Sequence, residues 1–314
     1  MIYLKLFGTD TERQACTDEY EYVSYTEETD KVHIHRLPEM KDNYLTLIAL
    51  EDGTIRYTNL NQTFGLQYST DDGETWSESS NNITINVNAD DKVLWKGFIE
   101  TTIGSAGSFS GSTSLFDIEG NVMSVLFGDD FADKTAFTNN YQKIYTLFRG
   151  SKCVHAHDLI LPVTDLSGHY SCYYAMFSGC TSLLTPPELP ATVLEASCYE
   201  EMFYYCESLT QAPELNAPIT KESCYDNMFV GCTSLTSSPV LPAKYVDISA
   251  YHGMFSGCTS LNHITMLATD GGNRAFSDWV YNVAATGTFV KDAEMTTLPS
   301  SQSGIPHGWT VIDT

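Results

Sequence analysis

One stretch of eight residues recurs four times in this chain at a fixed interval. "MFSGCTSL" begins at Met176 and again at Met254, and the near copies "MFYYCESL" and "MFVGCTSL" begin at Met202 and Met228. Each interval is 26 residues, without insertion or deletion. A period of about 20–50 residues is typical of a solenoid, in which each unit covers the apolar face of the next. The repeat therefore predicts a stacked array rather than a single catalytic constellation.

The pattern inside one unit predicts a short helix followed by an extended segment. In "SCYYAMFSGCTSLLTPPELPATVLEA", which begins at Ser171, the residues Cys172, Met176 and Cys180 are four positions apart. Such spacing is typical of the apolar face of a helix. A serine can cap the start of this helix, and Gly179 stands where it would end. The prolines that follow oppose a helix and favour an extended chain.

The array needs a first and a last unit. Upstream, "TLFRGSKCVHAHDLILP" carries Phe148 in the order of the repeat with altered spacing, which indicates a degenerate first copy. Downstream, Trp279 and Trp309 break the pattern, and bulky aromatic residues can close an apolar end. We therefore expect an α/β leucine-rich repeat solenoid of about five repeats over residues 146–261 and a C-terminal cap over residues 262–314.

Most of the cysteines follow the same period. The chain has nine cysteines, and seven fall in two columns of the repeat. The columns are Cys172, Cys198 and Cys224, and Cys180, Cys206, Cys232 and Cys258. Because cysteine is small and readily buried, stacked identical positions predict reduced, structural thiols. The count alone leaves a disulfide framework open.

These repeats resemble those of a known family. The tandem "CYxxMFxGCTSL…P.LPA", followed by "GTFVKDAE…SGIPHGWTVIDT", is similar to the BspA-like leucine-rich repeat proteins of gut bacteria and their phages. The resemblance covers about residues 145–314. It extends more weakly to "LQYSTDDGETW…VNADDKVLWKG" ahead of the repeats. It implies a binding role on a cell surface or a virion surface without catalysis, and it transfers no site residue.

The N-terminal half has no such period and reads as β structure. Between residues 43 and 145, β-branched and aromatic residues alternate with polar ones, and "EDG" and "DDG" are good hairpin turns. A β-sandwich-like domain is expected there. Residues 1–42 are predicted to be a small attachment segment, in which "YLKLF" and "KVHIHRL" are candidate strands on either side of an acidic stretch.

Charge argues against some classes of partner. The formal net charge is −24, and only Lys221 and Lys244 are basic between Cys172 and Leu261. A nucleic-acid surface would need a dense basic stripe, so no nucleic-acid partner is predicted. No stretch approaches the roughly 20 apolar residues that cross a bilayer, so no membrane insertion is predicted. The first residues lack the pattern of a secretory signal, which favours synthesis in a cytoplasm.

Two motifs suggest chemistry, and both have a structural interpretation. "STDDGETW" at Ser69–Trp76 matches the Asp-box pattern that sialidases carry on hairpin turns, but a single copy indicates a well-made hairpin. The pairs His33 and His35, and His155 and His157, could each offer two ligands to zinc. Two ligands do not make a metal site, so these histidines are interpreted as polar strand residues. No catalytic residue, metal or cofactor is predicted.

The variable positions of the repeat are the candidate binding residues. They lie between the constant tyrosine and methionine of each unit and should project outward in a row on a constant frame. These residues are Tyr174, Ala175, Glu200, Glu201, Asp226, Asn227, His252 and Gly253. A row of this kind predicts a contact surface, and an ordinary solvated face remains the alternative.

Together these features predict a non-enzymatic interaction protein. The expected place is a phage virion surface, as a head or tail fibre or a decoration protein assembled in host cytoplasm. Other virion proteins would bind the N-terminal region, and a host-surface protein or glycan would bind the repeats. A bacterial cell-surface adhesin is the alternative, and a glycan-acting enzyme is a third reading. Whether the chain forms a homo-oligomer is left open.

Overall fold

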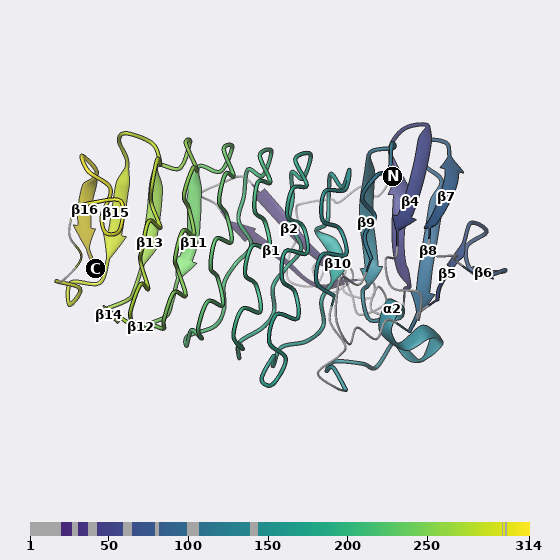
Figure 1. The fold of residues 1–314 in the computed structure, drawn as a ribbon, viewed down its shortest axis with the longest axis horizontal. Coiled ribbons are helices and arrows are strands. Elements are labelled where there is room, and N and C mark those ends of the chain that lie inside the picture. Colours follow the sequence, from purple (N-terminus) through teal and green to yellow (C-terminus); the bar gives the residue numbers. More distant parts are fainter. Residues whose placement is uncertain are drawn as a thin grey trace, which may run out of the picture.

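A computed structural model describes most of the chain as a β-rich molecule with almost no helix (Figure 1). The described residues are 43–58, 65–78, 82–98, 107–138, 144–296, 298 and 300–314, together with the backbone of 20–26 and 31–36. Among them, the helical segments are α2 (Ser124–Phe127) and the short 3-10 helix η2 (Gly128–Asp130). The backbone of β1 (Tyr20–Thr26) and β2 (Lys31–Arg36) forms an antiparallel pair. The predicted strand "YLKLF" lies outside the described residues.

The N-terminal domain has two β layers. One layer is a six-stranded sheet in the order β10-β9-β3-β8-β5-β6, antiparallel except for the pair β10 and β9. Its strands are β3 (Leu45–Ala49), β5 (Leu66–Ser69), β6 (Ser77–Glu78), β8 (Lys92–Gly97), β9 (Phe116–Asn121) and β10 (Asp158–Ile160). The other layer pairs β4 (Gly53–Thr58) with β7 (Asn82–Val87). Tyr57 of the second layer packs on Trp95 of the first, with ring centroids 5.7 Å apart.

One of the two predicted hairpins is confirmed and the other is wrong. "DDG" joins β5 to β6, and the two strands pair antiparallel. "EDG" does not join paired strands, because β3 already has β8 and β9 on its two edges. The chain therefore crosses at Gly53 from one layer to the other. There it passes so close to the backbone of Ser114 that a Cβ at Gly53 would lie 2.8 Å from the Ser114 nitrogen.

The predicted repeat helix is wrong: the segment is a run of turns. In residues 173–180, the backbone N–H groups donate alternately to a carbonyl of the next coil and to the carbonyl three residues earlier in the same coil. The Met176 N–H donates to the carbonyl three residues before it, that of Tyr173, at 3.3 Å. The N–H of the next residue, Phe177, donates to the carbonyl of Met202 in the following coil at 3.0 Å. Every fourth residue has a positive φ, as at Ala175 (50°) and Gly179 (75°), which no α-helix tolerates. The spacing of four residues belongs to this turn and not to a helix.

The stacked column that the repeat predicts is confirmed. Met176, Met202, Met228 and Met254 are each fully buried. Phenylalanines of successive coils stack face to face with centroids 5.3–5.7 Å apart. The constant tyrosines form a second column at 5.6–6.1 Å, in which the last pair is tilted by 35°. The phenylalanine stack is Phe148, Phe177, Phe203, Phe229 and Phe255, and the tyrosine stack is Tyr173, Tyr199, Tyr225 and Tyr251. Each coil therefore covers the apolar side of the next.

The eight described cysteines are buried thiols, without a disulfide among them. In the second column each Sγ–H donates to the carbonyl of the phenylalanine one coil earlier, at 2.9–3.1 Å. The pairs are Cys180 with Phe148, Cys206 with Phe177, Cys232 with Phe203, and Cys258 with Phe229. Burial raises the pKa of Cys180 to about 11 and that of Cys258 to about 12. These thiols stay protonated and act as packing groups that donate a weak hydrogen bond.

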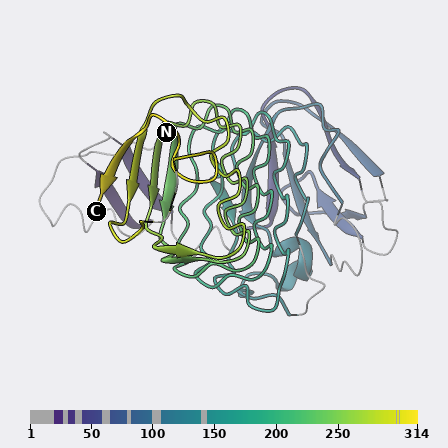
Figure 2. The same cartoon turned by 60° about the vertical axis from the view of Figure 1, so that its left-hand side comes forward.

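The opposite side of the coils becomes a parallel sheet only in the later units (Figure 2). Its strands, in the order β11-β13-β15-β16, are β11 (Ser237–Leu241), β13 (His263–Met266), β15 (Thr288–Lys291) and β16 (Thr310–Asp313). A smaller parallel pair joins β12 (Tyr245–Val246) to β14 (Asp270–Gly271). Earlier units carry prolines at Pro186, Pro187 and Pro213, and a proline cannot donate to a ladder. The chain there forms isolated parallel bridges, His155 with Thr185 and Asp165 with Val193, instead of a continuous ladder. β13 has no proline and pairs on both edges, whereas the ladder of β11, which contains Pro239, shifts register between Ser237 and Val240.

Both ends of the solenoid continue the stack. At the first end β10 pairs with β9 of the sandwich, and Phe109 stacks on Phe148 at 5.5 Å. At the other end β13, β15 and β16 continue the parallel sheet into the segment after Leu261. Trp279 lies over Tyr251 and Phe255 of the preceding coil, with ring centroids 6.4 and 6.1 Å away.

Candidate functional site

The first variable position of each repeat forms a row along the run of turns. Tyr174, Glu200, Asp226 and His252 occupy equivalent places in successive coils and are half-buried. The backbone sets this register, because the residue after each of the first three donates its N–H to the carbonyl of the next member. Ala175, for example, donates to the Glu200 carbonyl at 2.9 Å. The structure therefore places these four residues in one row, and their role as a contact surface stays a prediction.

The second variable position lies deeper than the sequence suggests. Ala175, Glu201, Asn227 and Gly253 have φ values of 50–60°, and Ala175 and Gly253 are buried. A Cβ at Gly253 would collide with the side-chain oxygen of Asn227, so the amide covers the glycine. The prediction that all eight residues project outward is thus wrong for Ala175 and Gly253, because a left-handed turn residue of small size is enclosed by its neighbours.

Side chains of the row contact one another from coil to coil. The Tyr174 hydroxyl donates to Glu201 Oε2 at 3.0 Å. Asp226 Oδ1 lies 2.8 Å from His252 Nδ1, and Arg274 Nη2 lies 3.5 Å from His252 Nε2. A guanidinium can only donate, so Nε2 accepts and the Nδ1–H is directed at Asp226. The row therefore consists of connected pairs, and one of its partners, Arg274, comes from outside the predicted row.

Burial also changes the acidity of the row. The partial burial of Glu200 raises the pKa of its carboxyl, and the nearby Asp226 and Glu201 add to this. Burial likewise raises the pKa of Asp226, although His252 and Arg274 act in the opposite direction. Partial burial therefore favours the protonated form of both carboxyls relative to exposed ones.

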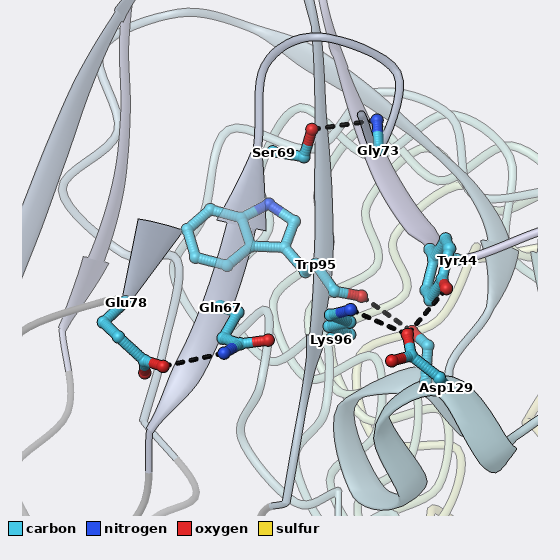
Figure 3. Close-up of polar contacts among 9 residues, drawn as sticks. Tyr44, Gln67, Ser69, Gly73, Glu78, Trp95, Lys96 and Asp129 are labelled. Atoms are coloured by element: carbon cyan, nitrogen blue, oxygen red, sulfur yellow. Dashed lines mark hydrogen bonds and ion pairs between the residues drawn. The ribbon is translucent and has the colours of Figure 1, made fainter. Parts of the chain in front are cut away.

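The Asp-box segment is a hairpin held by its own side chains, and Figure 3 shows the bond between Ser69 and Gly73. Ser69 Oγ donates to Asp71 Oδ1 at 2.6 Å, and Thr75 donates to Asp71 through Oγ1 at 2.6 Å and through its backbone N–H at 2.9 Å. The Gly73 N–H donates to Ser69 Oγ at 2.9 Å. These hydrogen bonds lower the pKa of Asp71 to about 2. Among the described residues, the hydrogen bonds of Asp71 all lie within the turn, which matches the structural interpretation of the motif.

A second cluster in the sandwich could not be recognised from the sequence. Lys96 Nζ lies 4.1 Å from the centroid of the Trp76 ring and 2.7 Å from Asp129 Oδ1. Tyr44 donates its hydroxyl to the same carboxylate oxygen at 2.7 Å, and Figure 3 shows both groups converging on Asp129. The cluster ties the Asp-box hairpin, β8 and η2 together. Its one sequence signal is a lysine near the end of the apolar strand "KVLWKG".

The histidine pair near the start of the solenoid shares one hydroxyl. His155 Nδ1 and His157 Nδ1 lie 2.9 and 3.3 Å from Thr185 Oγ1. His157 Nε2 lies 3.3 Å from Asp158 Oδ2. Within the described residues, no group of three or more His, Cys, Asp or Glu side chains is arranged to hold a metal. The side chains of His33 and His35 lie outside the description.

In the part of the chain that the structure describes, no helix is long and apolar enough to cross a membrane. No protein-family model, curated protein or solved structure matches this chain.

Proposed function

We propose that this chain is a non-enzymatic interaction protein of a phage virion surface, either a head or tail fibre or a decoration protein. In this proposal the N-terminal region binds other virion proteins, and a leucine-rich repeat solenoid binds a host-surface protein or a glycan. The resemblance to BspA-like proteins supports both the repeat class and the surface role. The α-helix that we expected in each repeat is absent, so the support for the repeat class comes from the period and the buried columns.

The observation that carries the proposal is the row of differing side chains on a repeated frame. Tyr174, Glu200, Asp226 and His252 occupy one position in successive coils whose buried residues are nearly identical. The buried columns are constrained by stacking, whereas the row differs in charge and in size. Solenoids bind partners through such rows, because a residue can change there without disturbing the stack.

Mass spectrometry of purified virus particles tests the placement. We expect the chain in a fixed ratio to the major capsid or tail proteins after density-gradient purification and salt washing. Particles that lack the chain would contradict the virion role.

A bacterial cell-surface adhesin is the second candidate, because the resemblance includes surface proteins of cells. Removal of a secretory signal would leave native material without the initiator methionine, so a retained Met1 in protein from its native source would argue against it. A glycan-acting enzyme is the third. Hydrolysis of a sialoside that disappears in a folded Asp71→Ala variant would establish the enzyme instead.

A further inference from the structure

One coil departs from the repeat at the surface. After the buried Met–Phe pair, the other three copies continue with "SG" or "VG", whereas the second copy continues with Tyr204 and Tyr205. Tyr205 therefore occupies the place of Gly179, Gly231 and Gly257. Its φ is 54°, in the left-handed region that glycine adopts freely and a tyrosine adopts only under strain.

The stack does not need a tyrosine at this place. The Tyr205 side chain is 46% exposed, while Phe203 and Cys206 on either side supply the buried columns. The Tyr205 N–H donates to the next coil at 2.7 Å, and the glycines at 179 and 231 make the same bond at 2.6 and 2.8 Å. A glycine would thus keep the backbone bond and remove the strain. A strained, exposed aromatic residue that the fold does not require points to a function.

The two tyrosines form a raised aromatic surface. Their rings meet edge to face, with centroids 4.6 Å apart and an interplanar angle of 64°. The equivalent positions in the coil before are Ser178 and Gly179, which are small. In the coil after, the Tyr205 ring lies against Gly231, where a Cβ would come within 2.9 Å of it. The exposed Tyr205 side chain therefore stands among small residues of the coils before and after it.

The surroundings of this aromatic pair are negative. The Tyr204 N–H donates to the Glu201 carbonyl at 3.0 Å, so Glu201 belongs to the same turn as the two tyrosines, and Glu201 Oε2 accepts the hydroxyl of Tyr174 at 3.0 Å. The whole chain carries −24 charges, so a positive partner is attracted over a distance before contact. Aromatic faces beside a carboxylate favour a cation, and they favour arginine most, because a guanidinium can stack and donate at the same time.

We propose that Tyr204, Tyr205 and Glu201 form a binding site for an arginine side chain in a basic, extended segment of a partner protein. The guanidinium stacks on the tyrosines and donates to the carboxylate. This inference rests on the proposed interaction function and assigns a partner chemistry to one part of the solenoid surface.

The test uses the full chain and a fluorescein-labelled peptide of alternating glycine and arginine, with binding followed by fluorescence anisotropy. The variant Tyr204→Ser/Tyr205→Gly installs the residues of the first copy and leaves the net charge unchanged. We expect its affinity for the peptide to fall at least ten-fold, while its melting temperature stays at or above that of the wild type. Tyr245→Ser is the matched control, because Tyr245 is 52% exposed elsewhere on the solenoid. Its affinity should stay within two-fold of the wild type.

Two further variants keep the test informative if the double variant folds poorly. Tyr204→Ser alone leaves the left-handed position untouched, and Glu201→Gln keeps the shape while removing the charge. Each should weaken binding several-fold, and Glu201→Gln should also reduce its dependence on salt.

Three results would overturn the inference. The first is a double variant that binds the peptide as the wild type does, and the second is a wild-type chain that does not bind it at millimolar concentration. The third is binding of a neutral oligosaccharide such as maltohexaose that is lost in the double variant while peptide binding is unchanged. In each case the proposed function stands if the chain is still found in particles, and it fails separately if it is not.

Discussion

At the scale of single residues, the left-handed positions explain which residues the repeat can vary. Every fourth residue of the turn run has a positive φ, and the chain uses glycine at 179, 231 and 257 but a serine at the start of each run. Serine at 171, 197, 223 and 249 was expected to cap a helix, yet it adopts φ values of 52–55°. These serines therefore do not cap a helix, and their left-handed backbone conformation turns the chain instead.

When a left-handed glycine is replaced by alanine, the loss in the free energy of unfolding should depend on the residue that faces it in the preceding coil. Gly231→Ala and Gly257→Ala share a φ penalty of about 1–2 kcal/mol. A Cβ at Gly231 would also meet the Tyr205 ring at 2.9 Å, whereas at Gly257 the nearest atom is 3.5 Å away. Urea unfolding should therefore show an extra loss of about 1 kcal/mol for Gly231→Ala. That extra loss should vanish in a Tyr205→Gly background, and equal losses in both backgrounds would refute the clash.

Two tyrosine hydroxyls should respond to removal in opposite ways. Among the described residues, the buried Tyr199 hydroxyl has no hydrogen-bond partner, whereas the Tyr174 hydroxyl donates to Glu201. Tyr199→Phe removes a buried polar group and should raise the free energy of unfolding by about 1 kcal/mol. Tyr174→Phe should lower it by about 1 kcal/mol. A loss of stability in Tyr199→Phe, measured by denaturant titration, would show that its hydroxyl is satisfied.

At the scale of elements, each turn run is stable only as a member of the stack. Half of its N–H groups donate to the next coil, so an isolated run could not satisfy them. Its apolar columns are covered in the same way. Unfolding of one coil should therefore expose both of its neighbours.

A charge in the methionine column should destabilise the array. Met228 is fully buried, and Met228→Asp places a carboxylate between two coils without a partner. We expect a loss of about 3–5 kcal/mol in the free energy of unfolding. Thr236→Asp adds the same charge at an exposed position of the same coil and should change stability by less than about 0.5 kcal/mol. Equal effects of the two substitutions would contradict the stacking.

The Asp-box hairpin should weaken in acid. Hydrogen bonds lower the pKa of Asp71 from 3.8 to about 2, so the ionised carboxylate stabilises the folded hairpin. This contribution is complete above about pH 4 and disappears as the pH falls through about 2. In the Asp71→Asn variant, the free energy of unfolding should no longer show the decrease that Asp71 causes between about pH 4 and about pH 2. A variant with an unchanged acid profile would show that the carboxylate contributes nothing.

At the scale of the whole molecule, the sandwich and the solenoid share one hydrophobic core. β10 of the first coil extends the six-stranded sheet, and the aromatic stack runs from Phe109 through Phe148 into the repeats. The buried side chains of both parts belong to one contiguous cluster that crosses this junction. The two parts are therefore expected to unfold together rather than as independent domains.

Phe148→Ala tests this coupling. The phenylalanine is fully buried between the two parts, and its truncation should cost about 3–5 kcal/mol. Hydrogen exchange should become faster both in β3 and β8 of the sandwich and in the coil that contains Phe177. Faster exchange confined to the coil would show that the sandwich folds on its own.

The candidate site was only partly predictable. The exact period identifies Tyr174, Glu200, Asp226 and His252 as equivalent positions, and the structure aligns them. Their contacts could not be predicted, because Arg274 lies in the segment read as a cap and Glu201 pairs with a residue 27 positions earlier. The Lys96 cluster was missed for the same reason, since Trp76 and Asp129 meet Lys96 only through the layering of strands.

The sequence alone was enough to establish the stack, because a strict period of apolar residues has few other ways to leave water. It also indicated the extended segments that follow the turns, since a proline opposes a helix. The choice between a helix and a run of turns was made only by the tertiary structure. A spacing of four residues fits both, and the decision depends on where alternate N–H groups find their acceptors. In the stack, the carbonyls of the next coil lie 2.6–3.0 Å away from residues 173–179, and they take the bonds that a helix would have kept within itself.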